Sequence, residues 1–399
     1  MRYATRYDVG DRTRPDGINE DSLAVTVFED GHREGYLGPD RGAGGRAGAD
    51  PDAGPDTGEE SEPATTRSTA VVVLADGAGG HEAGDAASYI ATTRVAEELA
   101  PVAVRAARED PGAFGLDLPA DAASASGAPP DGDLASTARA DGDGADDRTD
   151  AGVEGGDSPD SGSRRDRFHG AIEAALQRAH RDVLAYAEDA GTAAYTTVVA
   201  GLVVDGRFHY GWVGDSRAYV CNAAHDHIAR LTEDHAVVEQ LYADGELDGV
   251  EAHVHPRGNE LTRAVGGRGD AADVAVETAS VDLFAEDVLL LTSDGLPDAQ
   301  SDAPALYDRY VGSGRSADAA ARVREQVVTD ADIREWVLGA DSLSAAADRL
   351  IAEGNDRGGK DNLSVLLAQD PTLSETPARL PVRSRDPHPV HRRETVVEE

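Results

Sequence analysis

The sequence predicts an α+β fold in which two antiparallel β-sheets pack as a sandwich and α-helices flank them. Three observations lead to this prediction. Many short segments are rich in β-branched residues and are bounded by Gly or Asp, as strands are. Around Val203–Arg207, two such segments are joined by Asp-Gly, the dipeptide typical of a two-residue hairpin turn. A few long stretches place apolar residues at helical spacing, so strands outnumber helices.

The expected strands are short, and several contain an unbroken run of Val or Leu, which is typical of a strand buried on both faces. In chain order, strands are expected at 22–28, 68–75, 195–204, 207–213, 217–221, 273–280, 287–292 and 363–368. The clearest helical pattern has Ile172, Leu176, Ala179 and Val183 on one face. Helices are expected at 83–107, 167–189, 233–244, 316–329 and 342–353.

Three other segments have a composition that does not support a packed core. Residues 30–66 and 108–165 are rich in Gly, Asp, Ala, Pro and Ser, and residues 371–399 contain Pro, Arg and Glu with few apolar side chains. Such segments bury too little surface to offset the entropy of ordering. We therefore expect a single domain over residues 1–370, interrupted by two disordered insertions and followed by a disordered tail.

The charge of the chain excludes several kinds of partner. The net charge is −39, from 76 acidic and 37 basic residues. Nucleic acids and anionic membranes bind basic surfaces, so we expect neither as a partner. We interpret the acidity as adaptation to a salty cytoplasm, where a Debye length of about 3 Å at 1 M salt screens self-repulsion. An acidic protein in ordinary salt is the alternative.

The remaining composition indicates a cytoplasmic protein, which we expect to be a monomer. Cys221 is the only cysteine, so no intramolecular disulfide can form, and an intracellular location is favoured. The first residues lack an apolar signal-peptide region, and no stretch approaches 18 apolar residues.

Acidic residues recur where expected strands end or begin. Asp76 follows the apolar run 71–75 and opens a glycine-rich loop, and Asp294 follows the run 288–291 in the same way. Each motif alone is typical of a solvated turn, and the Asp76 loop alone could also cradle a phosphate. Carboxylates at several strand ends can, however, converge on a hard cation such as magnesium or manganese. The acidic residues placed in this way are Glu20, Asp21, Asp76, Asp215, Asp294 and Asp361.

With these motifs in this order, the chain resembles the metal-dependent serine/threonine protein phosphatases of the type 2C (PPM) family, and in particular its prokaryotic branch. The resemblance covers almost everything outside the three low-complexity segments. Its carriers are Asn19-Glu20-Asp21-Ser22, Ala75-Asp76-Gly77-Ala78-Gly79-Gly80-His81, Thr196-Thr197, Val213-Gly214-Asp215-Ser216-Arg217-Ala218-Tyr219, Leu231-Thr232-Glu233-Asp234-His235, Asn259-Glu260-Leu261-Thr262-Arg263-Ala264, Thr292-Ser293-Asp294-Gly295-Leu296 and Lys360-Asp361-Asn362-Leu363-Ser364-Val365.

The resemblance implies a sandwich with a site for two magnesium or manganese ions at one end. It implies that Asp76 bridges both ions and that the Gly77 carbonyl binds one of them. Asp294 and Asp361 would complete the coordination of the other ion, with Glu20 or Asp21 contributing directly or through water. By the same resemblance, Asp215 would bind a third, weaker ion, and residues 236–258 would form a flap beside the site.

Two positions depart from the family pattern. The family usually has a phosphate-binding arginine four residues before the Glu20 position, where this chain has Asp16. Arg14 is the nearby candidate for that contact. Ala78 stands where eukaryotic members have a histidine general acid, and its absence is common in the prokaryotic branch. Arg217 and Arg263 could also contact phosphate, but arginines in such positions more often hold a carboxylate.

The resemblance implies hydrolysis of phosphoserine and phosphothreonine by attack of a water molecule that bridges two metal ions. The substrates would then be phosphorylated proteins, made by a serine/threonine kinase. A catalytically inactive scaffold is one alternative, although loss of a metal ligand would be its expected mark. A hydrolase of small phosphate esters is the other, because the metal ligands do not set the substrate.

Overall fold

The computed structural model describes residues 1–11, 17–29, 32–37, 68–78, 81–107, 159–267, 273–300 and 302–383. Most of the two predicted insertions therefore lies outside the described residues, as does the end of the predicted tail. Their disorder stays a prediction.

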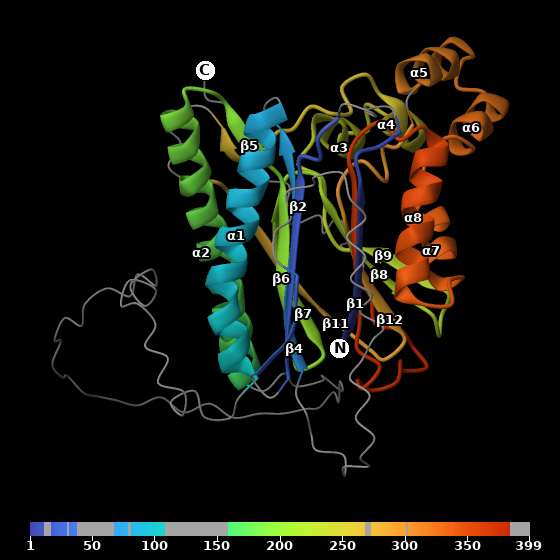
Figure 1. Cartoon of the computed structure of the whole chain (residues 1–399). Coiled ribbons are helices and arrows are strands. Elements are labelled where there is room, and N and C mark those ends of the chain that lie inside the picture. Colours follow the sequence, from blue (N-terminus) through green and yellow to red (C-terminus); the bar gives the residue numbers. More distant parts are fainter. Residues whose placement is uncertain are drawn as a thin grey trace, which may run out of the picture.

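Two antiparallel sheets form the centre of the protein, as the sequence predicts (Figure 1). The first sheet consists, in spatial order, of β1 (Arg2–Asp8), β13 (Leu363–Gln369), β12 (Asp287–Thr292), β8 (Arg217–Asn222) and β9 (His227–Arg230). The second consists of β10 (Val265–Gly267), β5 (Ala194–Thr196), β4 (Ser68–Ala78), β6 (Val198–Val204), β7 (Arg207–Val213) and β11 (Glu277–Asp282), with β2 (Asp21–Glu29) paired to β4 and β3 (His32–Leu37) paired to β2.

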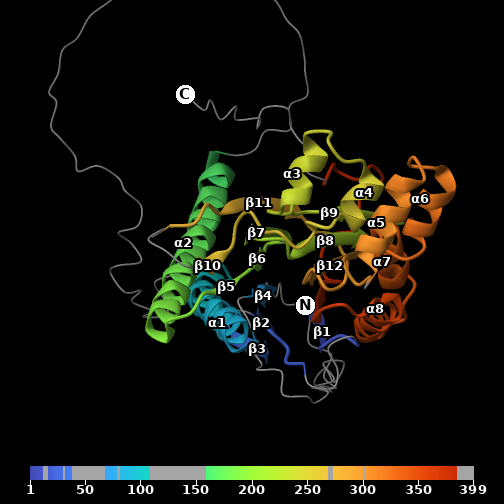
Figure 2. The same ribbon diagram turned by 90° about the horizontal axis from the view of Figure 1, so that it is seen from above.

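Helices cover both outer faces of the sandwich (Figures 1 and 2). The long helices α1 (His81–Ala106) and α2 (Pro159–Ala190) pack on the second sheet, and α7 (Asp330–Leu338) and α8 (Leu343–Arg357) pack on the first. Four shorter helices gather at one end, the upper end in Figure 1. They are α3 (Val237–Ala243), α4 (Gly249–Val254), α5 (Ala303–Gly312) and α6 (Ala317–Arg324).

Strand β4 contains a continuous apolar run because both of its faces are buried. Val71 and Val73 point into the core beneath α1 and α2, whereas Val72 and Leu74 point into the core between the two sheets. Successive side chains of a strand face opposite sides, so a strand covered on both sides must be apolar throughout. This strand therefore occupies the centre of its sheet and delivers Asp76 to one end of the sandwich.

The structure differs from the expected elements at two informative places. The expected strand 195–204 is divided at Thr197, whose backbone N–H donates to the Asp76 carbonyl (2.8 Å) outside the regular ladder. The expected helix 233–244 begins only at Val237, because Asp234 and His235 make tertiary contacts instead: Asp234 pairs with Arg217, and His235 contacts Gly214.

The predicted hairpin is confirmed. Val204 and Arg207 are paired residues of β6 and β7. The two turn residues between them, Asp205 and Gly206, have φ values of 50° and 71°. Positive φ at both central residues is what the tight type I′ turn requires, and it explains the Asp-Gly dipeptide.

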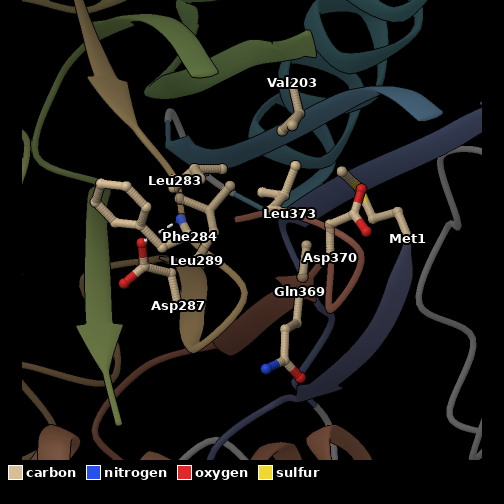
Figure 3. Close-up of a pocket in the computed structure, with 10 residues that line it drawn as sticks. Met1, Val203, Leu283, Phe284, Asp287, Leu289, Gln369, Asp370 and Leu373 are labelled. Carbon is tan, nitrogen blue, oxygen red and sulfur yellow. Dashed lines mark hydrogen bonds between the residues drawn. The ribbon is translucent and has the colours of Figure 1, made fainter. Parts of the chain in front are cut away.

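The first part of the predicted disordered tail is packed against the sandwich. Leu373 lies beside Met1, Val203 and Leu283 at the edge of the core between the sheets (Figure 3). Farther along, Arg383 is buried and forms two contacts of 2.6 Å with the Asp287 carboxylate. The composition of 371–383 suggested disorder, but the Leu373 and Arg383 side chains contact residues of the sandwich. Composition does not reveal such contacts.

None of the helices among the described residues combines the length and the apolar character needed to cross a membrane.

Candidate metal centre

A cavity of about 570 Å³ opens at one end of the sandwich, where loops from both sheets meet. Five acidic side chains line it, together with glycine, amide and apolar residues. The lining residues are Gly17, Ile18, Glu20, Asp76, Gly77, Ala78, Thr197, Asp215, Asn259, Leu261, Asp294, Asp361 and Asn362. The structure thus brings together the acidic residues that the sequence placed at strand ends, although they come from positions as far apart as 20 and 361.

The strand pairing explains this convergence. Asp76 lies near the end of β4 and is paired in register with Asp21 at the start of β2. Asp294 follows β12, and Asp361 precedes the adjacent antiparallel strand β13, so both emerge at the same end of the other sheet. Asp76 and Asp294 are close enough to share a hydrogen bond when one of them is protonated. The two sheets therefore face each other across this acidic pocket.

Two threonines fix the backbone of Asp76. The Thr196 hydroxyl and the Thr197 backbone N–H donate to the Asp76 carbonyl at 2.7 and 2.8 Å. The Asp76 backbone N–H donates to the Thr197 hydroxyl at 3.2 Å, and that hydroxyl is 2.6 Å from the Ser216 hydroxyl. Because Ser216 follows Asp215, one chain of hydrogen bonds orients two of the pocket carboxylates. This support role of Thr197 and Ser216 was not predicted from the sequence.

Asn362 holds the Glu20 loop against the Asp361 loop. Its side-chain oxygen accepts from the Glu20 backbone N–H at 2.7 Å, and its side-chain amide donates to the Ile18 carbonyl at 3.2 Å. The Asn362 backbone N–H donates to the Asp361 carboxylate at 2.9 Å. The backbone N–H of Asn362 therefore orients the Asp361 carboxylate, and its side-chain amide holds the Glu20 loop.

Glycine is required where α1 meets this loop. A Cβ atom on Gly77 would collide with the Gly84 carbonyl oxygen, and a Cβ on Gly84 would collide with the Glu20 carboxylate. The Gly77 backbone N–H also donates to the Glu20 carbonyl at 3.1 Å. The glycines after Asp76 therefore allow close approach of backbone to backbone.

Asp21 is buried behind the pocket instead of lining it. One of its carboxylate oxygens accepts from the Ser293 hydroxyl at 2.9 Å, whereas the other is buried without a hydrogen-bond partner. A buried acceptor without a partner is costly, so this atom fits a site completed by a bound cation or its water. Of the two acidic neighbours that the sequence left as alternatives, Glu20 reaches the pocket directly.

Burial and mutual repulsion raise the pKa values of these carboxylic acids. Burial, followed by the charges of Asp361 and Asp294, raises the pKa of Asp21 to about 8. Burial and the Asp361 charge raise the pKa of Asp294 to about 7. The pKa values of Asp76 and Asp215 are likewise raised, first by burial and then by neighbouring carboxylates. When these acids are ionised, their carboxylates repel one another, and a bound divalent cation would offset that repulsion.

The donor set fits hard cations that keep much of their water. Within the described ranges, no three His, Cys, Asp or Glu side chains are close enough together to hold a metal ion as a group. Magnesium usually retains several waters and needs only one or two carboxylates, and manganese also prefers oxygen donors. The oxygen-only lining of the pocket excludes a thiolate or imidazole site of the zinc type.

The candidate arginines give a mixed result. Arg14 lies outside the described residues. Arg217 instead holds Asp234, with three hydrogen bonds of 2.7 to 3.1 Å, and Arg263 contacts Glu277 at 3.3 Å. Both therefore hold carboxylates, the commoner of the two roles considered for them.

The pKa shifts predict how the stability of the metal-free protein depends on pH. Asp21 and Asp294 have pKa values of about 8 and about 7 in the fold, against 3.8 for an ordinary aspartic acid. The folded protein thus binds more protons, and its stability should fall as pH rises from 5.5 to 8.5 at constant KCl. Adding Mn²⁺ at pH 8 should raise the melting temperature by about 5 °C and release protons.

Thermal scans and calorimetry in buffers of different ionisation enthalpy would check this prediction. The variant Asp294→Asn serves as the control, because it removes one of the titrating groups and should flatten the pH dependence. A melting temperature independent of pH in the metal-free wild type would contradict the proposed electrostatics.

Comparison with known proteins finds sequence similarity to protein phosphatases. The model of the family "Protein phosphatase 2C" matches residues 157–241. The chain is 31% identical over 200 residues to the serine/threonine phosphatase stp of Listeria innocua, covering 50% of this chain and 66% of that protein. It is 27% identical over 172 residues to the protein phosphatase PhpP of Streptococcus pneumoniae, covering 43% of this chain and 56% of that protein.

Solved structures agree on the fold. The Mycobacterium tuberculosis phosphatase PstP/Ppp superposes with a TM-score of 0.53 at 22% identity, covering 94% of this chain and 99% of that one. Stp1 of Staphylococcus aureus gives a TM-score of 0.52 at 21% identity, with coverage of 93% and 95%.

The solved structures confirm the fold predicted from the sequence, a sandwich of two antiparallel sheets flanked by helices. The chain is similar to bacterial members of the protein phosphatase 2C (PPM) family, whose model matches residues 157–241. The aligned region spans just under two thirds of the length of the curated relatives that it matches first.

Proposed function

We propose that this protein is a metal-dependent serine/threonine protein phosphatase that hydrolyses phosphoserine and phosphothreonine. The observation that carries the proposal is the single pocket lined by Glu20, Asp76, Asp215, Asp294 and Asp361. The matched relatives are named as serine/threonine or protein phosphatases, which supports the same activity.

We assign the metal-holding role to named groups of this chain. Asp76 would hold two ions, with the Gly77 carbonyl on one of them and Asp294 and Asp361 on the other. Glu20 would contribute directly or through water, as would Asp21 from behind the pocket, and Asp215 would hold a third, weaker ion. The catalytic domain of the phosphatase PstP, whose structure superposes on this chain with a TM-score of 0.50, was solved in complex with two manganese ions. That complex supports this cofactor assignment. When bound, such ions neutralise phosphate oxygens and activate water.

The protein residues then have three tasks. Thr196 and Thr197 hold the Asp76 backbone in place, so that its carboxylate stays oriented toward the pocket. Asn362 keeps the Glu20 and Asp361 loops at a fixed separation. The apolar Ile18 and Leu261 side chains line the pocket beside the acids, where they can exclude bulk water from a bound phosphate ester.

A thiolate mechanism of phosphate-ester cleavage does not fit the chain. Cys221, the only cysteine, is buried in β8, and burial raises its pKa to about 12. A thiol with so high a pKa is not a nucleophile near neutral pH. We propose water as the nucleophile, activated by the ions that the acidic pocket would hold.

The proposed substrates are phosphorylated proteins made by a serine/threonine kinase, and we infer a cytoplasmic monomer that binds neither nucleic acid nor membranes. An inactive scaffold is disfavoured because every proposed carboxylate except Asp21 lines the pocket, and Asp21 lies directly behind it. The remaining alternative is the hydrolysis of small phosphate esters. It would use the same site and differ only in the class of substrate.

One assay tests the proposal. Hydrolysis of p-nitrophenyl phosphate and of a phosphothreonine peptide is measured at high KCl, with Mn²⁺ and with a chelator. We expect both substrates to be hydrolysed only with the metal. Absence of metal-dependent turnover for both would refute the enzymatic function, and turnover of the small ester alone would favour the alternative substrate class.

A further inference from the structure

The segment 236–258, which the resemblance implies is a flap, is followed by Asn259 and Leu261, which line the pocket, and its two ends are joined to each other. Ala236 and Leu261 form an isolated antiparallel bridge, and the Val237 backbone N–H donates to the Glu260 carbonyl at 2.8 Å. The Thr262 backbone N–H donates to the His235 carbonyl at 2.8 Å. We call residues 235–237 and 259–262 together the flap base. The flap base is a small closed unit that can be fixed or moved as one piece.

One side of the flap base is fixed to the turn that carries Asp215. The His235 backbone N–H donates to the Gly214 carbonyl, and the Gly214 backbone N–H donates to His235 Nδ1, each at 3.0 Å. The buried His235 ring also stacks on Trp212, with 6.0 Å between ring centroids. On this side, the flap base is therefore attached to the second sheet.

The other side is connected to the Asp361 loop by one side chain. Lys360 Nζ donates to Asn259 Oδ1 at 2.8 Å, between residues 101 positions apart in the chain. The Lys360 backbone N–H donates to the Ala299 carbonyl at 3.2 Å, which fixes the root of the lysine. Asn259 and Asp361, at the two ends of this connection, both line the pocket.

The choice of partner is informative in so acidic a protein. Lys360 is the only lysine in a chain that has 76 acidic residues. Its ammonium group hydrogen-bonds to a neutral amide at the flap base, and its charge also acts on the Asp294 and Asp298 carboxyl groups, where it partly offsets the rise in their pKa values. The contact joins two walls of the same pocket, one of which carries Asp361.

We propose that Lys360 is a positioning residue for the phosphatase reaction: by holding Asn259, it fixes the flap base against the Asp361 loop and thereby sets the width of the pocket. The flap base then spans the site, from the Asp215 turn on one side to the Asp361 loop on the other. The kinetic consequence of this proposal rests on the proposed function, whereas the contact and its effect on the flap do not.

A double-mutant cycle tests the coupling of the two side chains. Lys360→Met removes the donor but keeps a side chain of similar length, and Asn259→Ala removes the acceptor. We expect each single variant to lower kcat/KM for the phosphothreonine peptide about tenfold, because small displacements of a pocket wall are costly. Most of the loss should come from a higher KM. The double variant should lose no more than either single variant, since both remove the same contact.

Two further variants separate positioning from general electrostatics. Lys360→Arg keeps a donor and the positive charge and should stay within about threefold of wild type. Arg257→Met removes a positive charge from the flap itself, where Arg257 pairs with exposed Glu260 at 2.7 Å, and should leave kcat/KM unchanged. A loss that adds up to about a hundredfold in the double variant would overturn the proposal, because the two side chains would then act separately.

Hydrogen exchange gives a readout that does not depend on activity. Backbone amides of 236–258 should exchange faster in Lys360→Met and in Asn259→Ala than in wild type, and at the wild-type rate in Arg257→Met. Unchanged exchange in both of the first two variants would refute the connection. If the wild type itself has no metal-dependent turnover, the proposed function fails, and the exchange rates still decide whether Lys360 holds the flap.

Discussion

Replacing Asp76 by asparagine is expected to lower metal-dependent turnover at least about a hundredfold, which corresponds to about 2.7 kcal/mol of transition-state stabilisation. Asparagine has nearly the same shape, and the hydrogen bonds from Thr196 and Thr197 use only the backbone of residue 76. The substitution therefore removes the charge and one oxygen while the local fold is kept. Asp294→Asn should have an effect of the same size.

The same substitution should not destabilise the metal-free protein. Burial and the neighbouring acids raise the pKa of Asp76, so its charged form is disfavoured in the fold. A neutral amide removes that cost, and the melting temperature of metal-free Asp76→Asn at pH 8 should equal or exceed that of wild type. Loss of activity together with a maintained melting temperature would identify a functional carboxylate.

Steady-state kinetics at saturating Mn²⁺ and thermal scans in chelator give the two measurements. Asp205→Asn is the matched control: it makes the same chemical change in the β6–β7 turn, where asparagine tolerates the positive φ of 50°. Its turnover should match that of wild type. If Asp76→Asn retains near-normal kcat, the ligand assignment is wrong.

The second large effect is on stability. Arg383→Met is expected to lower the free energy of unfolding by about 3 kcal/mol, because it leaves the buried Asp287 carboxylate without its cation. The side chains of Arg383 and Asp287 are 1% and 2% exposed, and both guanidinium contacts measure 2.6 Å. The guanidinium group also lies 4.9 Å from the centre of the Phe284 ring. Asp287 would retain hydrogen bonds from Asn222 and from the Phe284 backbone, the latter visible in Figure 3.

Urea unfolding at constant KCl measures this loss. Arg207→Met is the control, because Arg207 forms an exposed ion pair with Asp282, which is 51% exposed, and such pairs contribute at most about 1 kcal/mol. Asp287 begins β12 and Asp294 follows its end, so Arg383 is remote from the pocket. Turnover of folded Arg383→Met should therefore stay within about twofold of wild type. Equal midpoints for Arg383→Met and wild type would show that residues 371–383 do not stabilise the domain.

The strands that the sequence predicted and those that it missed differ in burial. Strands β4, β6 and β12 are buried on both faces, and their apolar runs predicted all three. The prediction matched β12 to the residue, omitted the last three residues of β4 and joined β6 to β5 as one strand. Strand β1 was missed because it lies at an edge of its sheet, where Ala4 is its only buried residue and no apolar run marks it. Its strand conformation comes from pairing with β13, and a sequence pattern does not record pairing partners.

The short helices show the same limit. The helices α4, α5 and α7 had no clear periodicity over their 6 to 10 residues. Capping boxes at Asp248 and Thr329 stabilise α4 and α7. Packing also contributes: α4 packs on α5 and α6 through Val250, Val254 and Leu306, and α7 packs with α8.

The sequence by itself determined the chemistry of the site. It placed Asp76, Asp294 and Asp361 at strand boundaries with glycine or amide neighbours, and its motif order resembles that of the type 2C phosphatases. Only the tertiary structure decided which acids face the pocket. Glu20 lines it and adjacent Asp21 is buried behind it, because successive residues entering a strand point in opposite directions. The Lys360–Asn259 contact and the Arg383–Asp287 pair also required the fold, since each joins residues about a hundred positions apart.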